Sequence, residues 1–236
     1  IDQGSPPFDL WDVDIRRAQP FQRNRLYLKD RVKESLGLLF ADHFPYRQVE
    51  TSRGIRRSTL HEHLKKENAV FGELAGWERA NWFAIGNQEK KYIYDWKKQN
   101  WFENHKLEHL AIRNNVGLID MSSFGKIRVE GIDALSFCQR MFGNNVDVDI
   151  GKIVYTQMLN SNGGIESDLT VTRLERDCFL LVVPATTLVR DLNWLNRHKE
   201  SFNVVVTDVT SSEAVLVLMG PNSRKLLSEI SPNKFD

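Results

Sequence analysis

The hydrophobic pattern of the chain changes near residue 104. Before this point the sequence is rich in aromatic and basic residues and has few strand-like apolar runs. From Gly117 onward, short runs of Val, Ile and Leu recur at regular spacing. Short apolar runs bounded by turn residues are typical of strands. We therefore expect a first region over residues 1–104 and a second over residues 105–236.

In the first region, residues 24–40 carry apolar side chains at close to helical spacing, and Pro45 follows soon after. This pattern predicts one long amphipathic helix. Residues 58–66 resemble a second helix with Ser58 at the N-cap position. The segment 76–84 is too aromatic to lie in water, so we expect it to pack against a neighbouring element.

The second region combines helical and strand patterns. The turn sequences at 162–164 and 175–177 are typical of hairpin loops, which join antiparallel strands. Such a mixture favours an α+β fold built on an antiparallel sheet. The expected helices span 107–115, 132–142, 186–198 and 224–230, and the expected strands span 125–130, 152–160, 165–174, 178–183, 203–208 and 214–219.

Composition and charge narrow the class of partner. The 236 residues include 32 basic and 31 acidic side chains, a net charge of +1, so no global attraction to nucleic acid or to an anionic membrane is indicated. No apolar run is long enough to cross a bilayer. Cys138 and Cys178 form no CxxC motif, so neither a disulfide framework nor a cysteine zinc site is indicated. A small molecule or a protein is the remaining expectation for the partner. The two ends of the sequence suggest that the chain is an internal piece of a longer protein.

Two carboxylates stand on the strand that follows the Asn162-Gly163-Gly164 turn. Side chains alternate along a strand, so Glu166 and Asp168 share one face. A carboxylate held in a partly dry pocket suits a cationic intermediate. Alternatively, the turn is only a hairpin and both acids face water. The local pattern leaves these two interpretations evenly balanced.

Several motifs resemble a known family. One set looks like the first half of the glycine-cleavage T-protein fold: residues 107–122, 155–160, 163–169 and 220–222. A second set, residues 52–58 and 76–83, resembles the central segment that joins a flavin domain to that fold in dimethylglycine and sarcosine dehydrogenases. The two sets occur in the order that this family requires and together span most of residues 47–222.

The resemblance implies a two-step oxidoreductase. A flavin removes a hydride from an N-methyl amine, and tetrahydrofolate captures the resulting iminium or formaldehyde unit as 5,10-methylenetetrahydrofolate. This chain would contribute to the second step and would be inactive alone. No GxGxxG motif follows a strand, so FAD would be held by the rest of the same polypeptide. The family places the protein in a bacterial cytoplasm or the mitochondrial matrix.

The same resemblance suggests site residues. Asp168 matches the catalytic aspartate beside folate N10, and Tyr155 matches an aromatic residue that contacts the folate. Glu166 is a weaker candidate, because Ser167 stands where the family has its second acid. Phe124 replaces a methionine of the T-protein pattern. Val183 lies in the pterin-facing stretch 182–185, which has Pro184 in place of an asparagine.

Other interpretations of the sequence remain open. Arg53, Arg56 and Arg57 could attract a carboxylate or the polyglutamate tail of folate, but a solvated loop is favoured. The aromatic and lysine-rich segment from Trp82 to Trp101 could form a stacking and phosphate-binding surface, but a linker packed by its indoles is favoured.

Two rival functions are also weighed. His105 and His109 have a spacing that can bind zinc, but no motif supplies a third ligand, so no metal site is expected. The regulatory subunit of pyruvate dehydrogenase phosphatase shares the same architecture, so a non-catalytic binding protein is the alternative function. Asp168 and Tyr155 favour the enzyme.

Overall fold

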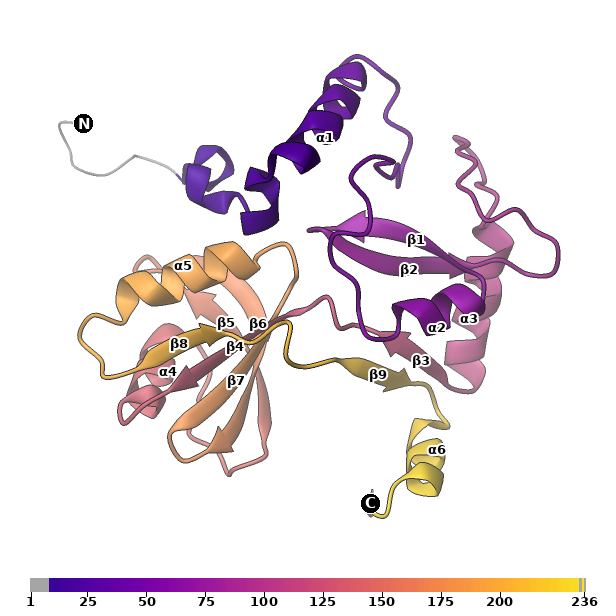
Figure 1. The fold of residues 1–236 in the computed structure, drawn as a ribbon. Helices are drawn as coiled ribbons and strands as arrows, with labels where there is room; N and C mark the ends of the chain where they lie inside the picture. Colours follow the sequence, from indigo (N-terminus) through magenta and orange to yellow (C-terminus); the bar gives the residue numbers. More distant parts are fainter. Residues whose placement is uncertain (1–8, 234, 236) are drawn as a thin grey trace. The chain divides into compact units, whose positions relative to one another are not determined.

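The computed structural model describes residues 9–233 and residue 235 (Figure 1). It contains two compact units, and each combines two separate stretches of the chain. Unit 1 comprises Ile1–Asn24 and Phe124–Glu213, and unit 2 comprises Arg25–Ser123 and Ala214–Asp236. The boundary expected near residue 104 falls inside helix α3, Phe102–Asn114. The division into sequence domains at that point stays a prediction.

Unit 1 is built on a five-stranded sheet with the order β5-β6-β7-β4-β8, in which all neighbours are antiparallel. The α+β fold with an antiparallel sheet is therefore confirmed. Its elements are the short 3-10 helices η1 (Trp11–Val13), η2 (Ile15–Arg17) and η3 (Pro20–Arg23), the strands β4 (Gly125–Glu130), β5 (Ile153–Leu159), β6 (Ile165–Glu175), β7 (Cys178–Val183) and β8 (Val205–Asp208), and the helices α4 (Ala134–Met141) and α5 (Leu188–His198).

One face of this sheet is buried under helices α4 and α5. Alternate residues of each strand point to this face, as the period of two requires. Phe137 of α4 and Leu195 of α5 pack in the same core as the strand residues. The buried strand residues are Ile127, Val129, Met158, Leu169, Val171, Phe179, Leu181 and Val183. The opposite face of β5 and β6 carries polar and aromatic side chains.

Unit 2 contains a helix-flanked hairpin and a second small sheet. The hairpin pairs β1 (Ala69–Leu74) with β2 (Trp77–Phe83), and the second sheet pairs β3 (Gly117–Asp120) with β9 (Leu216–Met219). The helices are α1 (Arg25–Gly37), α2 (His61–Lys66), α3 and α6 (Ser223–Ile230). A tight turn joins β1 to β2, where Ala75 and Gly76 both have positive φ, at 51° and 82°.

An aromatic cluster lies beside the β1–β2 hairpin. Trp82 is fully buried and packs against Trp101 and Tyr92, with Tyr94 alongside. The expected packing of the aromatic segment 76–84 is therefore confirmed. In the segment that follows, Tyr92 and Tyr94 pack against this cluster, whereas Trp96 is exposed. The hairpin itself was not expected, because few apolar runs mark the first region.

Helix α1 forms within the expected range, but its expected apolar face is not buried in this chain. Tyr27 is its one buried residue. The side chains of Leu26, Leu28, Val32 and Leu36 are exposed. The helical spacing therefore predicted where the helix lies, but not which of its side chains are buried.

Gly131 has a backbone position that only glycine fits. Its φ is 141°, and a Cβ atom there would lie 2.2 Å from the backbone oxygen of Asn203. We expect Gly131→Ala to lower the free energy of unfolding by about 2–4 kcal/mol, because strain and a backbone clash add. Gly163→Ala is the matched control: its φ is 77° with no atom within 4 Å, so strain alone should cost about 1 kcal/mol. Urea unfolding measures both losses, and equal losses would contradict the clash.

Candidate functional site

The hairpin between β5 and β6 is fixed by one asparagine. The side-chain oxygen of Asn160 accepts hydrogen bonds from the backbone N–H groups of Asn162 and Gly164, at 3.0 and 2.9 Å. Its side-chain amide donates to Glu166 Oε1 at 2.9 Å. Asparagine commonly holds turns through such local bonds. This turn sets the register that places the acidic residues of β6 beside β5.

Tyr155 and Asp168 form a hydrogen-bonded pair on the open face of the sheet. Asp168 lies opposite Gln157 in the register of β5 and β6, so Tyr155 is its diagonal neighbour. The Tyr155 hydroxyl donates to Asp168 Oδ2 at 2.5 Å. This hydrogen bond raises the pKa of Tyr155. The phenol therefore stays protonated and holds the carboxylate from one side.

Asp168 is exposed in this chain, so of the two interpretations that the sequence left open, this structure agrees with the one in which the acid faces water. The cause is the alternation of β6: Ser167, Leu169 and Val171 face the core, and Glu166 and Asp168 face away from it. Tyr155 is also 58% exposed. Among the described residues, the Oδ1 atom of Asp168 is given no hydrogen-bond partner, so it is available to a ligand.

Glu166 shares this face but has a different role in the structure. Its Oε2 atom accepts a hydrogen bond from Arg190 at 2.7 Å, and its side chain is only 11% exposed. Arg190 also pairs with Asp9 at 3.0 Å. Glu166 is thus already neutralised by a cation, and it is less available to a ligand than Asp168.

The structure brings three of the five sequence-predicted site residues together: Tyr155, Glu166 and Asp168. Phe124 is half-buried just before β4. Val183 is 1% exposed and its side chain packs in the core, so it offers only backbone atoms to a ligand. The roles of all five residues stay predictions.

Asp191, which the sequence analysis did not single out, lies behind this face. It is fully buried, and its Oδ2 atom accepts hydrogen bonds from Ser167 at 3.0 Å and Thr187 at 2.7 Å. Burial raises the pKa of Asp191 to about 6. A sequence signal existed: Asp191 stands between Leu188 and Leu195 on the apolar side of helix α5. Ser167 links this buried acid to the strand that carries Asp168.

The raised pKa of Asp191 makes stability depend on pH. Its ionised form is disfavoured in the folded state, so its contribution is most favourable below the unfolded pKa near 4 and is lost as the pH rises through about 6. As the pH rises from 4 to 7, the free energy of unfolding of the unchanged chain should fall by on the order of 1–3 kcal/mol more than that of Asp191→Asn. Urea unfolding at a series of pH values measures this. Asp177→Asn, in an exposed turn, is the control, and parallel pH profiles for all three chains would contradict the assignment.

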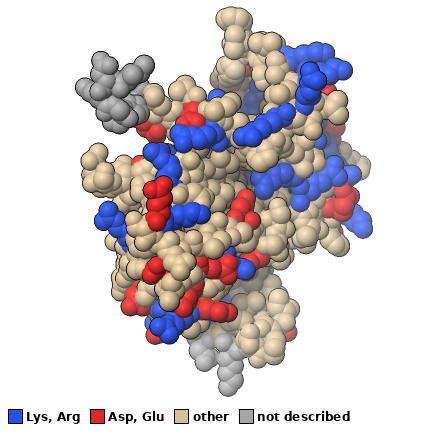
Figure 2. All heavy atoms as spheres, turned by 60° about the vertical axis from the view of Figure 1, so that its left-hand side comes forward, with Lys and Arg blue, Asp and Glu red and all other residues tan. Residues whose placement is uncertain are grey.

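On the face that Figure 2 shows, Lys and Arg side chains predominate toward the upper right, and Asp and Glu side chains are more frequent lower down, with basic ones among them. Within the described residues, no group of three or more His, Cys, Asp and Glu side chains is arranged to hold a metal ion. His105, one of the histidines weighed for zinc, contacts the backbone oxygen of Asn81 through Nε2 at 2.8 Å. None of the helices over residues 9–233 has the length and apolar character needed to cross a membrane.

The antiparallel sheet of unit 1 carries an acidic hairpin, which is the β5–β6 hairpin with Glu166 and Asp168. The chain belongs to the family described as GCVT N-terminal domain, which matches residues 60–236. Residues 3–58 match the FAD dependent oxidoreductase central domain. Both families of the resemblance are therefore confirmed, although residues 76–83, which the motifs assigned to the central segment, lie within the GCVT match.

Individual relatives agree with this assignment. The chain is 44% identical over 232 residues to 4-methylaminobutanoate oxidase (formaldehyde-forming) of Paenarthrobacter nicotinovorans, covering 98% of this chain and 28% of that protein. It is 31% identical over 270 residues to sarcosine dehydrogenase of Mus musculus, covering 98% and 29%. It is also 34% identical over 235 residues to the pyruvate dehydrogenase phosphatase regulatory subunit of Mus musculus, covering 97% and 27%. The chain thus spans less than a third of each relative.

A solved structure supports the fold. The glycine cleavage system aminomethyltransferase T of Bartonella henselae superposes with a TM-score of 0.61 at 28% sequence identity, over 75% of this chain and 44% of that chain. The T-protein-like fold inferred from the sequence is therefore confirmed.

Proposed function

We propose that this chain is part of a flavin-dependent oxidoreductase acting on N-methyl amines, and that it helps tetrahydrofolate capture the released one-carbon unit as 5,10-methylenetetrahydrofolate. The observation that supports this most is the Tyr155–Asp168 pair on the open sheet face. One carboxylate oxygen is held by the phenol and the other is available, within a domain of the T-protein family. The folate site is proposed to be completed by other parts of the longer protein.

The residues present fit a role in this chemistry. Bound tetrahydrofolate would supply the nitrogen atoms that accept the one-carbon unit. Asp168 would stabilise positive charge near its Oδ1 atom and accept a proton there. Tyr155 would keep the carboxylate oriented through Oδ2. Glu166, Phe124 and the backbone of Val183 would border the ligand.

Flavin chemistry is assigned to other parts of the longer protein. The matched central-domain segment, residues 3–58, lacks a GxGxxG motif, so the proposal places FAD on other sequence. The 236-residue chain alone is accordingly proposed to be inactive. Its compartment, a bacterial cytoplasm or the mitochondrial matrix, also stays a prediction.

The test is a product assay on the complete protein. Sarcosine, dimethylglycine and 4-methylaminobutanoate are supplied in turn, with and without tetrahydrofolate, and both formaldehyde and 5,10-methylenetetrahydrofolate are measured. We expect one of these amines to be oxidised, with tetrahydrofolate diverting the product from formaldehyde to the folate adduct faster than the two combine in solution. Equal formaldehyde release with and without tetrahydrofolate would contradict the folate role.

A non-catalytic regulatory function is the second candidate. It is favoured by the 34% identity to the pyruvate dehydrogenase phosphatase regulatory subunit over nearly the whole chain. Under this alternative the complete protein would oxidise none of the three amines. The same assay therefore separates the two functions.

A further inference from the structure

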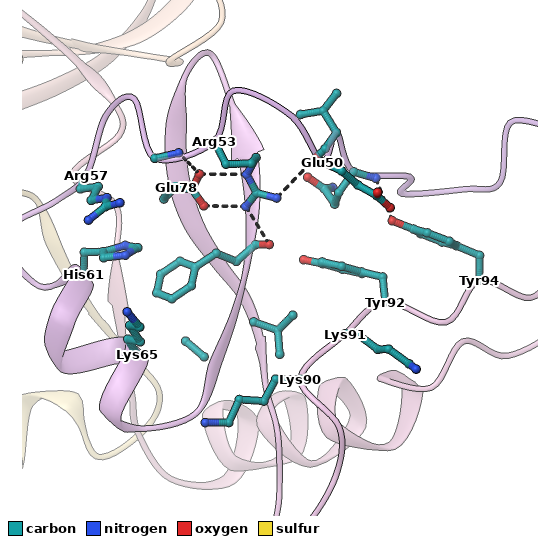
Figure 3. A pocket seen from close by; sticks show the side chains of 16 residues that line it. Glu50, Arg53, Arg57, His61, Lys65, Glu78, Lys90, Lys91, Tyr92 and Tyr94 are labelled. Atoms are coloured by element: carbon teal, nitrogen blue, oxygen red, sulfur yellow. Dashed lines mark hydrogen bonds and ion pairs between the residues drawn. The ribbon is translucent and has the colours of Figure 1, made fainter. Parts of the chain in front are cut away.

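Unit 2 contains a cavity of about 660 Å³ that the proposed folate chemistry does not use. It lies between helix α2, the β1–β2 hairpin and the loop around Tyr92 (Figure 3). A volume of this size is within the usual range, roughly 300–1,000 Å³, for small-molecule sites. The cavity is therefore large enough for a ligand the size of a substituted aromatic acid.

The cavity wall carries an excess of positive charge. Arg57 and Lys65 stand on one side and Lys90 on another, as Figure 3 shows. Arg57 and Lys65 approach the same carboxylate, Glu62, only at 3.8 and 4.0 Å, so one acid is shared by two cations. Lys91 of the same wall pairs with Glu89 at 2.8 Å, whereas Lys90 forms no ion pair with the residues that the structure describes. On a chain of net charge +1, this is a local concentration of cations.

A buried ion pair fixes the wall but is not available to a ligand. Arg53 donates two hydrogen bonds to the carboxylate of Glu78, at 2.9 and 2.5 Å, and others to the backbone oxygens of Val49 and Phe71, each at 3.0 Å. The Arg56 guanidinium lies over the Trp77 ring at 4.3 Å. The three arginines of the sequence cluster therefore have separate surroundings, and only Arg57 offers its charge to the cavity. Glu50 adds one acidic group to the wall.

Flat rings form the apolar part of the cavity. The His61 and Phe71 rings lie 4.3 Å apart, and the Tyr92 and Tyr94 rings are parallel within 6° at 5.9 Å. Burial raises the pKa of Tyr92 to about 12, and the Tyr94 hydroxyl accepts a hydrogen bond from the Gln48 backbone at 2.9 Å. Tyr92 therefore adds no negative charge at neutral pH.

His61 also lines this wall, and one of its ring nitrogens has no hydrogen-bond partner among the described residues. The residue is 8% exposed, and the nitrogen is its Nδ1 atom. Burial and the neighbouring Arg57 charge lower the pKa of His61, so the imidazole is neutral at pH 7. The Nδ1 atom is enclosed by the protein and does not face the cavity, so His61 contributes an uncharged ring to the wall.

We propose that this cavity binds a small organic anion that carries a phosphate or several carboxylates on a flat apolar ring. The anionic groups are held by Arg57, Lys65 and Lys90, and the ring packs against Phe71 and Tyr92. Cations on more than one side favour a multivalent anion over a single carboxylate. The proposal is independent of the folate role, because it involves none of the residues of the acidic hairpin.

The test uses the 236-residue chain and isothermal titration calorimetry. The probes are 1-naphthyl phosphate and benzene-1,2,4-tricarboxylate, with pyrophosphate and 1-naphthol as the anion without a ring and the ring without an anion. We expect at least one ring-bearing anion to bind with a Kd below roughly 1 mM and about tenfold more tightly than either partial probe. Comparing the two ring-bearing probes shows whether phosphate or carboxylate is preferred.

A matched pair of variants locates the binding. Arg57→Gln with Lys65→Gln removes two cavity cations, both more than half exposed, and should weaken binding about tenfold or more. Lys106→Gln with Arg113→Gln removes the same charge from exposed positions on α3 and should leave binding unchanged. Circular dichroism confirms that both variants fold.

Three results would overturn the proposal. The first is that neither ring-bearing anion binds. The second is that both double variants weaken binding equally, which would indicate general attraction to the charged surface. The third is that 1-naphthol binds as tightly as 1-naphthyl phosphate, which would show that the cations contribute nothing.

Discussion

Replacing Asp168 by asparagine in the complete protein is expected to slow methylene transfer to tetrahydrofolate by about 100-fold. Asparagine keeps the size of the side chain and can still accept the Tyr155 hydrogen bond, but it neither carries charge nor accepts a proton. Because that charge would act on the reacting cation, the Kd for tetrahydrofolate should change less than about threefold. Rapid-mixing product analysis measures the rate, and equilibrium titration measures the Kd.

Two comparisons make the Asp168 result specific. Asp177→Asn removes a carboxylate from the exposed turn between β6 and β7 and should leave the transfer rate unchanged. Flavin reduction by the amine should also stay at its original rate in both variants, because it precedes the folate step. Unchanged product yield and rate in Asp168→Asn would show that this carboxylate is a bystander.

The second large effect concerns stability, at the ion pair between Arg53 and Glu78. The Glu78 side chain is 6% exposed and also accepts a hydrogen bond from the Gly54 backbone at 2.6 Å. Removing one partner of a buried pair costs about 3–5 kcal/mol of stability. Because Arg53 is partly exposed, we expect Glu78→Gln to lower the free energy of unfolding by about 2–3 kcal/mol. Urea unfolding at pH 7 measures the loss. Glu89→Gln, which breaks an exposed pair with Lys91, should change stability by less than about 0.5 kcal/mol.

The sign of the pH effect at Glu78 provides a further check. Burial alone would raise the pKa of Glu78, but hydrogen bonds from Arg53 and Gly54 and the Arg53 charge outweigh it, so the pKa is lowered. Stability from this group is present above the unfolded pKa near 4 and is lost as the pH falls through the folded value. The difference in stability between the unchanged chain and Glu78→Gln should therefore shrink in acid. A difference that grows in acid would contradict the assignment.

Much of unit 1 could be predicted from the sequence, because one face of its sheet is buried. The strands expected over 125–130 and 178–183 match β4 and β7, and the strand expected over 165–174 matches β6 to within one residue. Alternating burial leaves a period-two pattern that local analysis detects. The helix expected over 186–198 begins two residues late, at Leu188, which is ordinary for helix ends.

Other features could not be predicted, because they depend on contacts between distant residues. The β1 strand is interrupted by Gly72 and Glu73, and β2 carries charged and polar residues between its aromatic ones, so their pairing left little local signal. The alternation of β6 places Glu166 and Asp168 on one face of the sheet, but the sequence does not show which face the helices cover, so the exposure of Asp168 could not be predicted. The cavity cations come from two separate segments, around Arg57 and Lys65 and around Lys90. The sequence analysis weighed the arginine cluster and the lysine-rich segment separately for anion binding, but only the fold brings them to one cavity.

The two faces of the β5–β6 ladder separate the requirements of folding from those of chemistry. Leu169 and Val171 hold the domain together on one side, and Tyr155 and Asp168 stand on the other, where a substitution removes no core contact. A protein with this fold could therefore lose Tyr155 and Asp168 during evolution and still keep a well-folded domain.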